Sequence, residues 1–150
     1  MKIHEAIKQN KFTTNVDMAI VNIVYTSNWL HDSQKKFFTK HNIKAQHYNI
    51  LRILKGRHPA AASPGEIKEV MLDKSPDLTR LIDKLVVQKL VERYMCEENR
   101  RKVDVFITDK GISLLKLIAE DMKEVNDVWK SKLSEVEAGK LSDLLDKLRN

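Results

Sequence analysis

The longest hydrophobic pattern in the chain runs from about residue 14 to residue 40. Apolar side chains recur there at intervals of three or four, and neither glycine nor proline interrupts them. They are Val16, Ala19, Ile20, Ile23, Val24, Leu30 and Phe37. Because this spacing lines one side of an α-helix, the pattern predicts one long amphipathic helix. A shorter pattern over residues 43–54, ended by Gly56 and Pro59, predicts a second helix, and residues 2–9 predict a short helical turn.

Two helix-start signals then follow close together. Ser63 and Glu66 have the spacing of a capping box, so a short helix is expected from there to about Leu72. Ser75, followed by Pro76, is the second signal. It opens a helical pattern whose apolar members are Leu78, Leu81, Ile82 and Leu85. Since only two residues separate the two predicted helices, the sequence predicts a helix-turn-helix with a tight turn.

The hydrophobic period changes from helical to alternating after residue 90. Val103, Val105 and Ile107 alternate along one segment, and residues 91–96 are rich in strand-compatible side chains. The polar run "EENRRK" lies between the two segments. This arrangement predicts a β-hairpin with a charged tip.

Two more helices are expected after the hairpin. Thr108 caps a pattern that continues to Trp129, and a second capping box, Ser134 with Glu137, opens the last helix. The whole order predicts a fold that is mainly α with a small β-hairpin wing, namely a winged helix-turn-helix over about residues 43–110 within a single domain. The flanking segments, residues 1–40 and 111–150, have more apolar surface than this unit can cover. We therefore expect them to be dimerisation helices that pair with a second copy of the chain, giving a homodimer.

Composition and charge limit the classes of partner that the protein can bind. The 150 residues suit one domain, and the net charge of +6 fits an anionic partner. The positive surplus lies mostly in residues 1–60, which hold ten Lys or Arg against three Asp or Glu, so DNA binding has to be argued from the placement of side chains. No apolar run is long enough for a signal peptide or a membrane span, so we expect a cytoplasmic protein without a membrane partner.

The outer side of the helix that follows Ser75 carries small polar and basic residues, namely Thr79, Arg80 and Lys84. A DNA major groove about 12 Å wide accepts one α-helix, so these side chains are placed to meet base edges of double-stranded DNA. The predicted hairpin tip carries Arg100, Arg101 and Lys102. Such a tip can reach phosphates or put a guanidinium into a narrow minor groove.

At this point the residues resemble a known family. The stretch "DKSPDLTRLIDKLVVQKLVERYMCEENRRKVDVFITDKG" is similar to the recognition helix and wing of the MarR family of bacterial winged-helix regulators. The resemblance is strongest over residues 63–111, and the flanking helices extend it more loosely to nearly the whole chain. It implies a sequence-specific transcriptional regulator, with repression as the expected mode. The regulator would bind a pseudo-palindromic operator as a homodimer, and a small-molecule effector or an oxidant would release it.

Carried over by position, the resemblance assigns roles to several residues. Ser75 to Lys84 would enter the major groove, and Arg101 would be the wing arginine that enters the minor groove. Asp83 matches an acidic position that can pair with a wing arginine, here Arg101. The wing departs from the family pattern at Asn99, where an aspartate is usual, so a hydrogen bond from Asn99 to a guanidinium would lack charge assistance.

Each of these interpretations has a plainer alternative. Thr79, Arg80 and Lys84 can form an ordinary solvated helix face. The alternative function is a winged-helix protein-protein interaction module without specific DNA binding. The resemblance also suggests a ligand pocket between the dimerisation and DNA-binding parts, and its candidate residues are Tyr25, Trp29 and Tyr48. Ordinary packing is the alternative for these aromatic side chains.

The remaining reactive side chains carry weaker signals. Cys96 excludes an internal disulfide framework because it is the one cysteine, and it has no neighbouring His that would favour redox sensing. The histidines lack the paired spacing of a metal site, so no metal is expected; a zinc site assembled from distant segments would use His31, His41 and His47 first. No phosphate loop or catalytic motif is present, so we expect neither an enzyme nor a cofactor.

Overall fold

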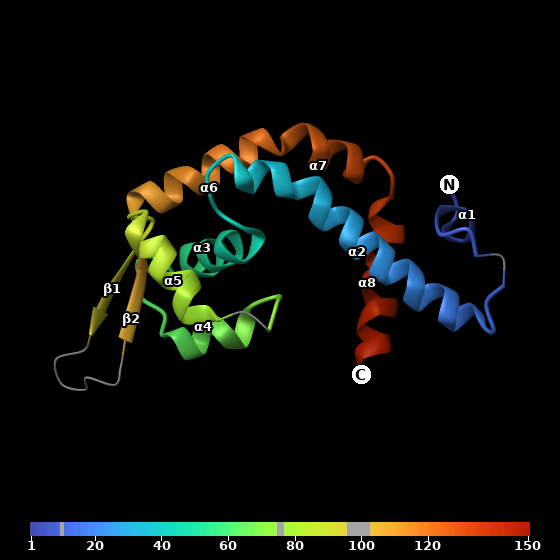
Figure 1. Ribbon diagram of the computed structural model, residues 1–150, viewed down its shortest axis with the longest axis horizontal. Coiled ribbons are helices and arrows are strands. Elements are labelled where there is room, and N and C mark those ends of the chain that lie inside the picture. The colour runs from blue at the N-terminus through green and yellow to red at the C-terminus, as the bar shows by residue number, and fades with distance from the viewer. Residues whose placement is uncertain (10, 75–76, 96–102) are drawn as a thin grey trace.

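The computed structural model describes residues 1–9, 11–74, 77–95 and 103–150. Helices make up most of these residues, and an antiparallel pair of strands completes the architecture (Figure 1). The helices are α1 (Ile3–Ala6), α2 (Asn15–Thr39), α3 (Ala45–Arg57), α4 (Pro64–Val70), α5 (Leu78–Val87), α6 (Asp109–Asp121), α7 (Lys123–Lys130) and α8 (Glu135–Arg149). The strands are β1 (Val91–Met95) and β2 (Val103–Ile107). The prediction of a mainly α fold with a β-hairpin wing between long flanking helices is confirmed.

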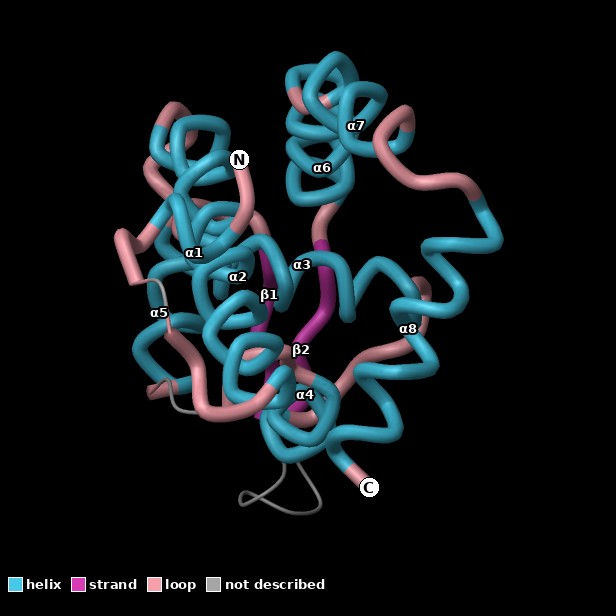
Figure 2. Tube along the Cα trace, turned by 90° about the vertical axis from the view of Figure 1, so that its right-hand side faces the viewer, coloured by secondary structure: helices cyan, strands magenta, loops and turns pink. Residues whose placement is uncertain are grey.

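The elements form an arch with a small bundle at one end. α3, α4, α5 and the hairpin lie together at that end, α6 and α7 run along the top, and α2 descends to the other end, where α1 lies (Figure 1). α8 follows α7 and lies apart from the other helices in the view turned by 90° (Figure 2). None of the residues of α8 is buried. Within the described ranges, no helix is long and apolar enough to cross a lipid bilayer.

One hydrophobic core holds the small bundle and α6 together, and α3 is at its centre. Ile50, Leu51 and Leu54 of α3 are at most 1% exposed. They pack with buried side chains from α4, α5, β2 and α6, including Ile67, Ile82, Leu85, Val105 and Ile118. The core therefore fixes α5 by its apolar side and leaves the opposite side of that helix free.

The hairpin is attached to the bundle on both of its strands. Val91 pairs with Ile107 and Arg93 with Val105 across the hairpin, and Val91 and Val105 are at most 1% exposed. Beyond the hairpin, Val105 exchanges two backbone hydrogen bonds of 3.0 Å with Ala62, in the α3–α4 loop. Ala62 thus forms an isolated antiparallel β-bridge on the outer edge of β2.

The start of α6 is bonded to the segment that follows α5. Thr108 caps α6 by accepting from the Gly111 N–H, and its hydroxyl donates to the carbonyl oxygen of Lys89 at 2.8 Å. Lys89 has a φ of 59°, the left-handed conformation common just after a helix. A Cβ on Gly111 would lie 2.3 Å from the Leu90 carbonyl oxygen, so only glycine fits this approach.

The predicted tight turn between α4 and α5 is wrong. α4 ends at Val70 and α5 begins at Leu78, so the connection is seven residues long rather than two. Asp77 caps α5 by accepting from the Arg80 N–H at 3.4 Å, whereas the sequence had assigned the cap to Ser75, which lies outside the described residues. The chain leaves α4 in an extended conformation at Met71, whose side chain is buried in the core, and this contact ends α4 early.

The predicted continuous helix from Thr108 to Trp129 is also interrupted. α6 ends at Asp121 and α7 begins at Lys123, with Met122 buried between them. Asp121 accepts a hydrogen bond of 2.9 Å from Lys40 at the end of α2, and this bond lowers the pKa of its carboxyl group. Contacts from distant parts of the chain therefore hold this junction. The other predicted elements, including the long α2 and the capping boxes of α4 and α8, are confirmed.

Candidate nucleic-acid interface

The exposed side of α5 is the centre of the candidate interface. Ile82 and Leu85 anchor the helix in the core, and Thr79 and Arg80 consequently face solvent. The Arg80 side chain is 87% exposed, and its Nε lies 3.3 Å from an Oδ2 oxygen of Asp77. Two of the four side chains that the sequence predicts for the recognition helix are thus accessible, with a guanidinium beside the helix start.

Lys84, the third predicted contact on this helix, points elsewhere. Its ammonium donates to the Asn42 side-chain oxygen at 3.3 Å, and Gln88 donates to the Asn42 carbonyl oxygen at 3.1 Å. Asn42 belongs to the turn between α2 and α3 and has a φ of 55°. The second half of α5 is therefore tied to this turn, and Lys84 faces the turn rather than the side that carries Thr79.

Lys84 also lines a cavity of about 340 Å³ between α2, α3 and α5. The cavity is lined by His31, Lys35, Phe38, Thr39, Asn42, Ile43, Lys44, Ala45, Gln46 and Lys84. Three of these side chains are lysines and none is a carboxylate. The first residues of α3 are in the lining, so the positive end of that helix adds to the same field.

His47 supports the start of α3 beside this cavity. The side chain is 2% exposed, and its Nδ1 accepts a hydrogen bond of 2.9 Å from the Lys44 backbone N–H. Burial lowers the pKa of His47 from 6.5 to about 4, and the nearby charges of Lys84 and Lys44 add to this shift. The imidazole is therefore neutral near pH 7 and replaces the small polar cap that this helix lacks.

The histidines named for zinc do not meet in one place. His31 lines the cavity, His47 is buried in the first turn of α3, and His41 lies 3.7 Å from Asp121 at the α2–α6 junction. Among the described residues, no group of three or more His, Cys, Asp or Glu side chains is arranged to hold a metal ion.

The predicted wing residues lie outside the described part of the chain. They are Asn99, Arg100, Arg101 and Lys102, together with Cys96. The same holds for the predicted pair of Asp83 with Arg101. What the structure does show is that Asp83 pairs with Arg93 of β1, at 2.5 Å between Oδ1 and Nη1. The sequence analysis missed Arg93, although the alternation along β1 puts it on the same side as Val91.

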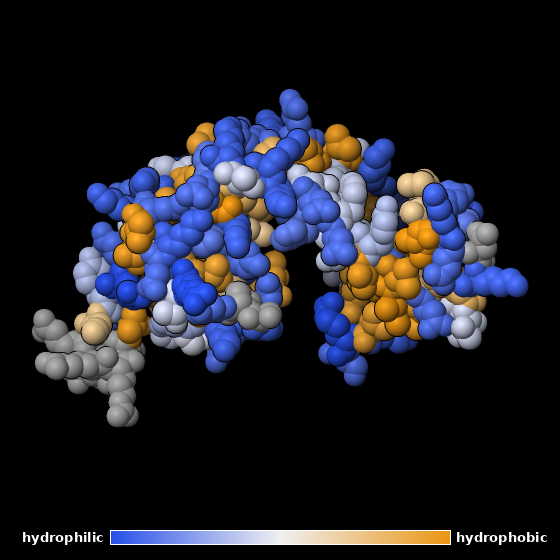
Figure 3. All heavy atoms as spheres, viewed as in Figure 1, coloured by the Kyte–Doolittle hydropathy of each residue, from blue (hydrophilic) through white to orange (hydrophobic). Residues whose placement is uncertain are grey.

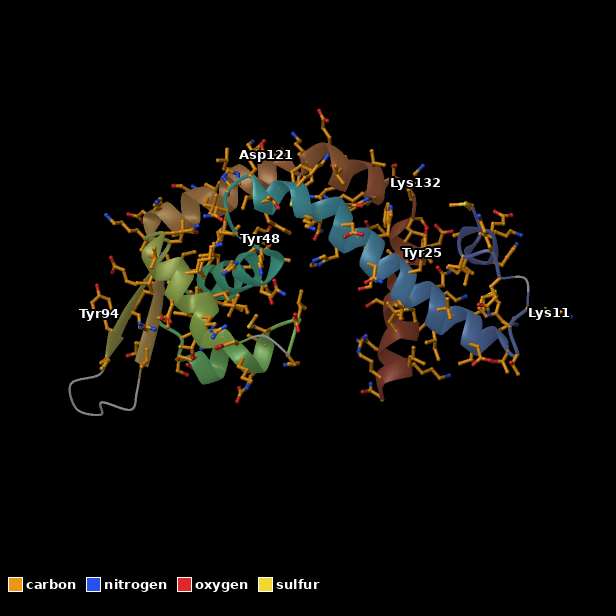
Figure 4. All side chains as sticks on the ribbon, in the orientation of Figure 1. Lys11, Tyr25, Tyr48, Tyr94, Asp121 and Lys132 are labelled. Atoms are coloured by element: carbon orange, nitrogen blue, oxygen red, sulfur yellow. The ribbon has the colours of Figure 1, made fainter. Side chains whose placement is uncertain are left out.

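The three aromatic residues named for a ligand pocket do not come together: Tyr25 and Trp29 lie on α2, and Tyr48 lies on α3. Tyr48 packs against Phe38 at a ring distance of 4.9 Å, and Trp29 packs against Trp129 of α7 at 5.9 Å. Tyr25 lies one helical turn before Trp29 in α2 and is 42% exposed (Figure 4). None of the three lines the cavity at Lys84. Within one chain they therefore form no common site.

Comparisons with known proteins agree with this geometry. Residues 41–102 match the MarR family. The HTH-type transcriptional regulator PecS of Dickeya dadantii is 31% identical over 114 residues, which cover 75% of this chain and 69% of PecS. The crystal structure of a MarR transcription factor from Planctomyces limnophilus is 31% identical, with a TM-score of 0.70 over 91% of this chain and 98% of that one.

A solved structure with DNA bound shares the fold as well. It is a MarR variant from E. coli complexed with operator DNA, 23% identical, with a TM-score of 0.73 over 92% of this chain and 99% of that one. Three findings agree: the family match over residues 41–102, the identity to PecS over most of both chains, and the shared winged-helix geometry. The chain therefore belongs to the MarR family of transcriptional regulators.

Proposed function

We propose that this protein binds double-stranded DNA sequence-specifically in the cytoplasm and reads its operator with the exposed side of α5. The observation that carries the proposal is the pair of accessible side chains, Thr79 and Arg80, on a helix that shares one hydrophobic core with the β-hairpin. A helix presented in this way fits a major groove, and the neighbouring hairpin reaches the adjacent backbone. The E. coli MarR whose fold this chain shares was solved on operator DNA, which supports the same use of the bundle here.

The apolar surface of the flanking helices supports a homodimer. Val16, Ile20, Val24 and other apolar residues of α2 are exposed, and so are four apolar residues of α8: Val136, Leu141, Leu144 and Leu148. The space-filling view shows an apolar patch at the end of the arch away from the hairpin, where α2 and α8 lie (Figures 1 and 3). Patches of this kind on soluble proteins usually mark an interface. A second copy of the chain would bury them and present two α5 helices to one duplex.

The dimer predicts the form of the operator. Two-fold symmetry of the protein requires a pseudo-palindromic site whose half-sites lie about one helical turn, or ~34 Å, apart. A dimer across a promoter would exclude polymerase, so we extend the proposal to repression. A reporter gene under a promoter that contains the selected operator tests this: expression falls when the protein is present, and a rise would make the protein an activator.

The cavity at Lys84 supports release by an acidic small molecule. Its three lysines face the space between α2 and α3, and Lys84 belongs to the helix that we place against DNA. An anion bound there would draw on the same ammonium that holds α5 to the α2–α3 turn. It is a different site from the pocket that the resemblance suggests at Tyr25, Trp29 and Tyr48, since none of these three residues lines it. Benzoate and acetate are suitable probes, with Lys44→Gln as the variant that should weaken their effect on the DNA complex.

Selection from a randomised duplex pool, followed by sequencing at two salt concentrations, tests the DNA proposal. Recovery of a pseudo-palindrome supports it, and salt-sensitive binding without sequence preference refutes base readout. If no duplex is retained, a protein partner becomes the better explanation of the same surface. Sedimentation velocity on the free protein tests the dimer separately.

Variants of the selected complex test the role of α5 directly. Arg80→Ala should lower affinity for the operator more than affinity for random DNA, because a base contact carries the sequence preference. Arg52→Ala removes the same charge from the exposed side of α3 and serves as the control. An equal loss on both duplexes for Arg80→Ala would place this arginine on phosphate instead.

A further inference from the structure

Asp83 and Arg93 join the two parts of the candidate interface. Asp83 lies in the middle of α5, and Arg93 lies in the middle of β1, ten residues later. Their side chains meet at 2.5 Å and are 48% and 39% exposed, so both are partly shielded from water. A guanidinium and a carboxylate held this close form a charge-assisted hydrogen bond that is directional as well as attractive.

The position of Arg93 in β1 lets this contact restrain the hairpin. Arg93 stands opposite Val105, and both backbone hydrogen-bonding groups of Val105 are used by Ala62 on the other edge of β2. The hairpin is thus held on one side by the Ala62 segment and on the other by the ion pair with α5. A rotation of the hairpin away from α5 would separate Arg93 from Asp83.

The position of Asp83 on α5 means that the contact also changes the charge of the exposed side of this helix. Asp83 follows Thr79 by four residues and Arg80 by three, so the three side chains are neighbours on the helix surface. A carboxylate beside the base-reading residues repels DNA phosphates unless a cation neutralises it. Arg93 is the cation that the structure places against it.

We propose that Arg93 is a positioning residue for operator binding, which fixes the hairpin against α5 and neutralises Asp83 without itself contacting DNA. The inference rests on the proposed function, because it concerns how that interface is set. Arg93 differs from the arginines of the predicted hairpin tip in both location and role, because it lies within β1 and acts through a carboxylate of α5.

The first test needs no DNA, so it stands even if the proposed function fails. Amide hydrogen exchange is measured by mass spectrometry on the full chain and on three variants: Arg93→Ala, Asp83→Ala and Arg52→Ala. Loss of either partner of the pair should speed exchange in β1 and leave α2 unchanged, whereas Arg52→Ala should alter neither. Unchanged exchange in β1 for both pair variants would overturn the positioning role.

The second test is a double-mutant cycle on the selected operator. Arg93→Ala should weaken binding by about tenfold, the size of a typical coupling between contacting residues. Adding Asp83→Ala to that variant should recover part of the loss, because the unpaired carboxylate is then gone. Arg93→Lys should retain more affinity than Arg93→Ala, since it keeps the charge at the carboxylate.

Salt dependence separates positioning from direct contact. Removal of a residue that binds a phosphate reduces the magnitude of the slope of log affinity against log salt concentration by about 0.9. Arg93→Ala should keep the slope of the natural chain. A reduced slope, or losses for Arg93 and Asp83 that simply add, would assign Arg93 to phosphate binding and refute the proposal. Complete loss of folding is checked by circular dichroism, and Arg93→Lys is then the variant that decides.

Discussion

Protonation of His47 should weaken the fold in mildly acidic solution. Burial and two neighbouring lysines lower the pKa of this imidazole from 6.5 to about 4. Between pH 6.5 and pH 4 the imidazole of the unfolded chain is protonated while that of the folded chain stays neutral. Proton binding therefore favours the unfolded chain, and the free energy of unfolding is highest above pH 6.5 and decreases as the pH falls toward 4. Between pH 7.5 and pH 5 the linkage relation gives a loss of about 2 kcal/mol in the free energy of unfolding.

Urea unfolding followed by circular dichroism at half-unit steps from pH 7.5 to pH 5 measures this loss. His47→Gln is the matched variant, because its side-chain oxygen can still accept from the Lys44 N–H without binding a proton. It should lose about 2 kcal/mol less than the natural chain over this range. His58→Gln, at an exposed histidine, should follow the natural chain. Equal pH dependence for His47→Gln and the natural chain would refute the assignment of a neutral buried His47.

Three further changes test the packing and capping. Gly111→Ala should destabilise the fold by about 1–3 kcal/mol, because the new methyl group meets the Leu90 carbonyl oxygen; thermal unfolding measures it, and an unchanged midpoint would mean that α6 can shift freely. Gly139→Ala, with nothing within 4 Å of the added group, should stabilise α8 by roughly 0.5–1 kcal/mol in the same assay, and destabilisation would contradict an open site. Glu66→Gln should lower the unfolding midpoint at pH 7, because hydrogen bonds from Ser63 hold the pKa of Glu66 at about 2; the difference should fade as the pH falls from 4.5 to about 2, and a constant difference would point to another cause.

Local signals predicted the elements that depend on local interactions. The capping box of Ser134 with Glu137 marked the start of α8 correctly, and the alternation around Val105 marked β2. Both succeed because a cap and a strand period are set by residues a few positions apart. The same rules failed at Ser75, since Asp77 two residues later caps α5 equally well in chemistry and fits the path out of α4.

The features that the sequence left hidden depend on distant partners. Lys84 turns toward Asn42, which is 42 residues earlier in the chain, and no helical period contains that information. The break at Met122 follows from contacts of α6 with α2, again far apart in sequence. Arg93 was overlooked because its partner becomes a neighbour only after the hairpin folds back onto α5. The sequence therefore predicted that Thr79 and Arg80 lie on the exposed side of α5, but it did not predict the partners of Lys84 and Arg93.

The β-bridge at Ala62 also blocks pairing with a strand of another copy at Val105. A free strand edge offers unpaired N–H and C=O groups, and these recruit strands of other molecules into aggregates. At Val105 both groups of β2 already bond to Ala62, so a foreign strand finds no pairing partner at this point. At this position the edge of β2 is therefore not available as a template for self-association.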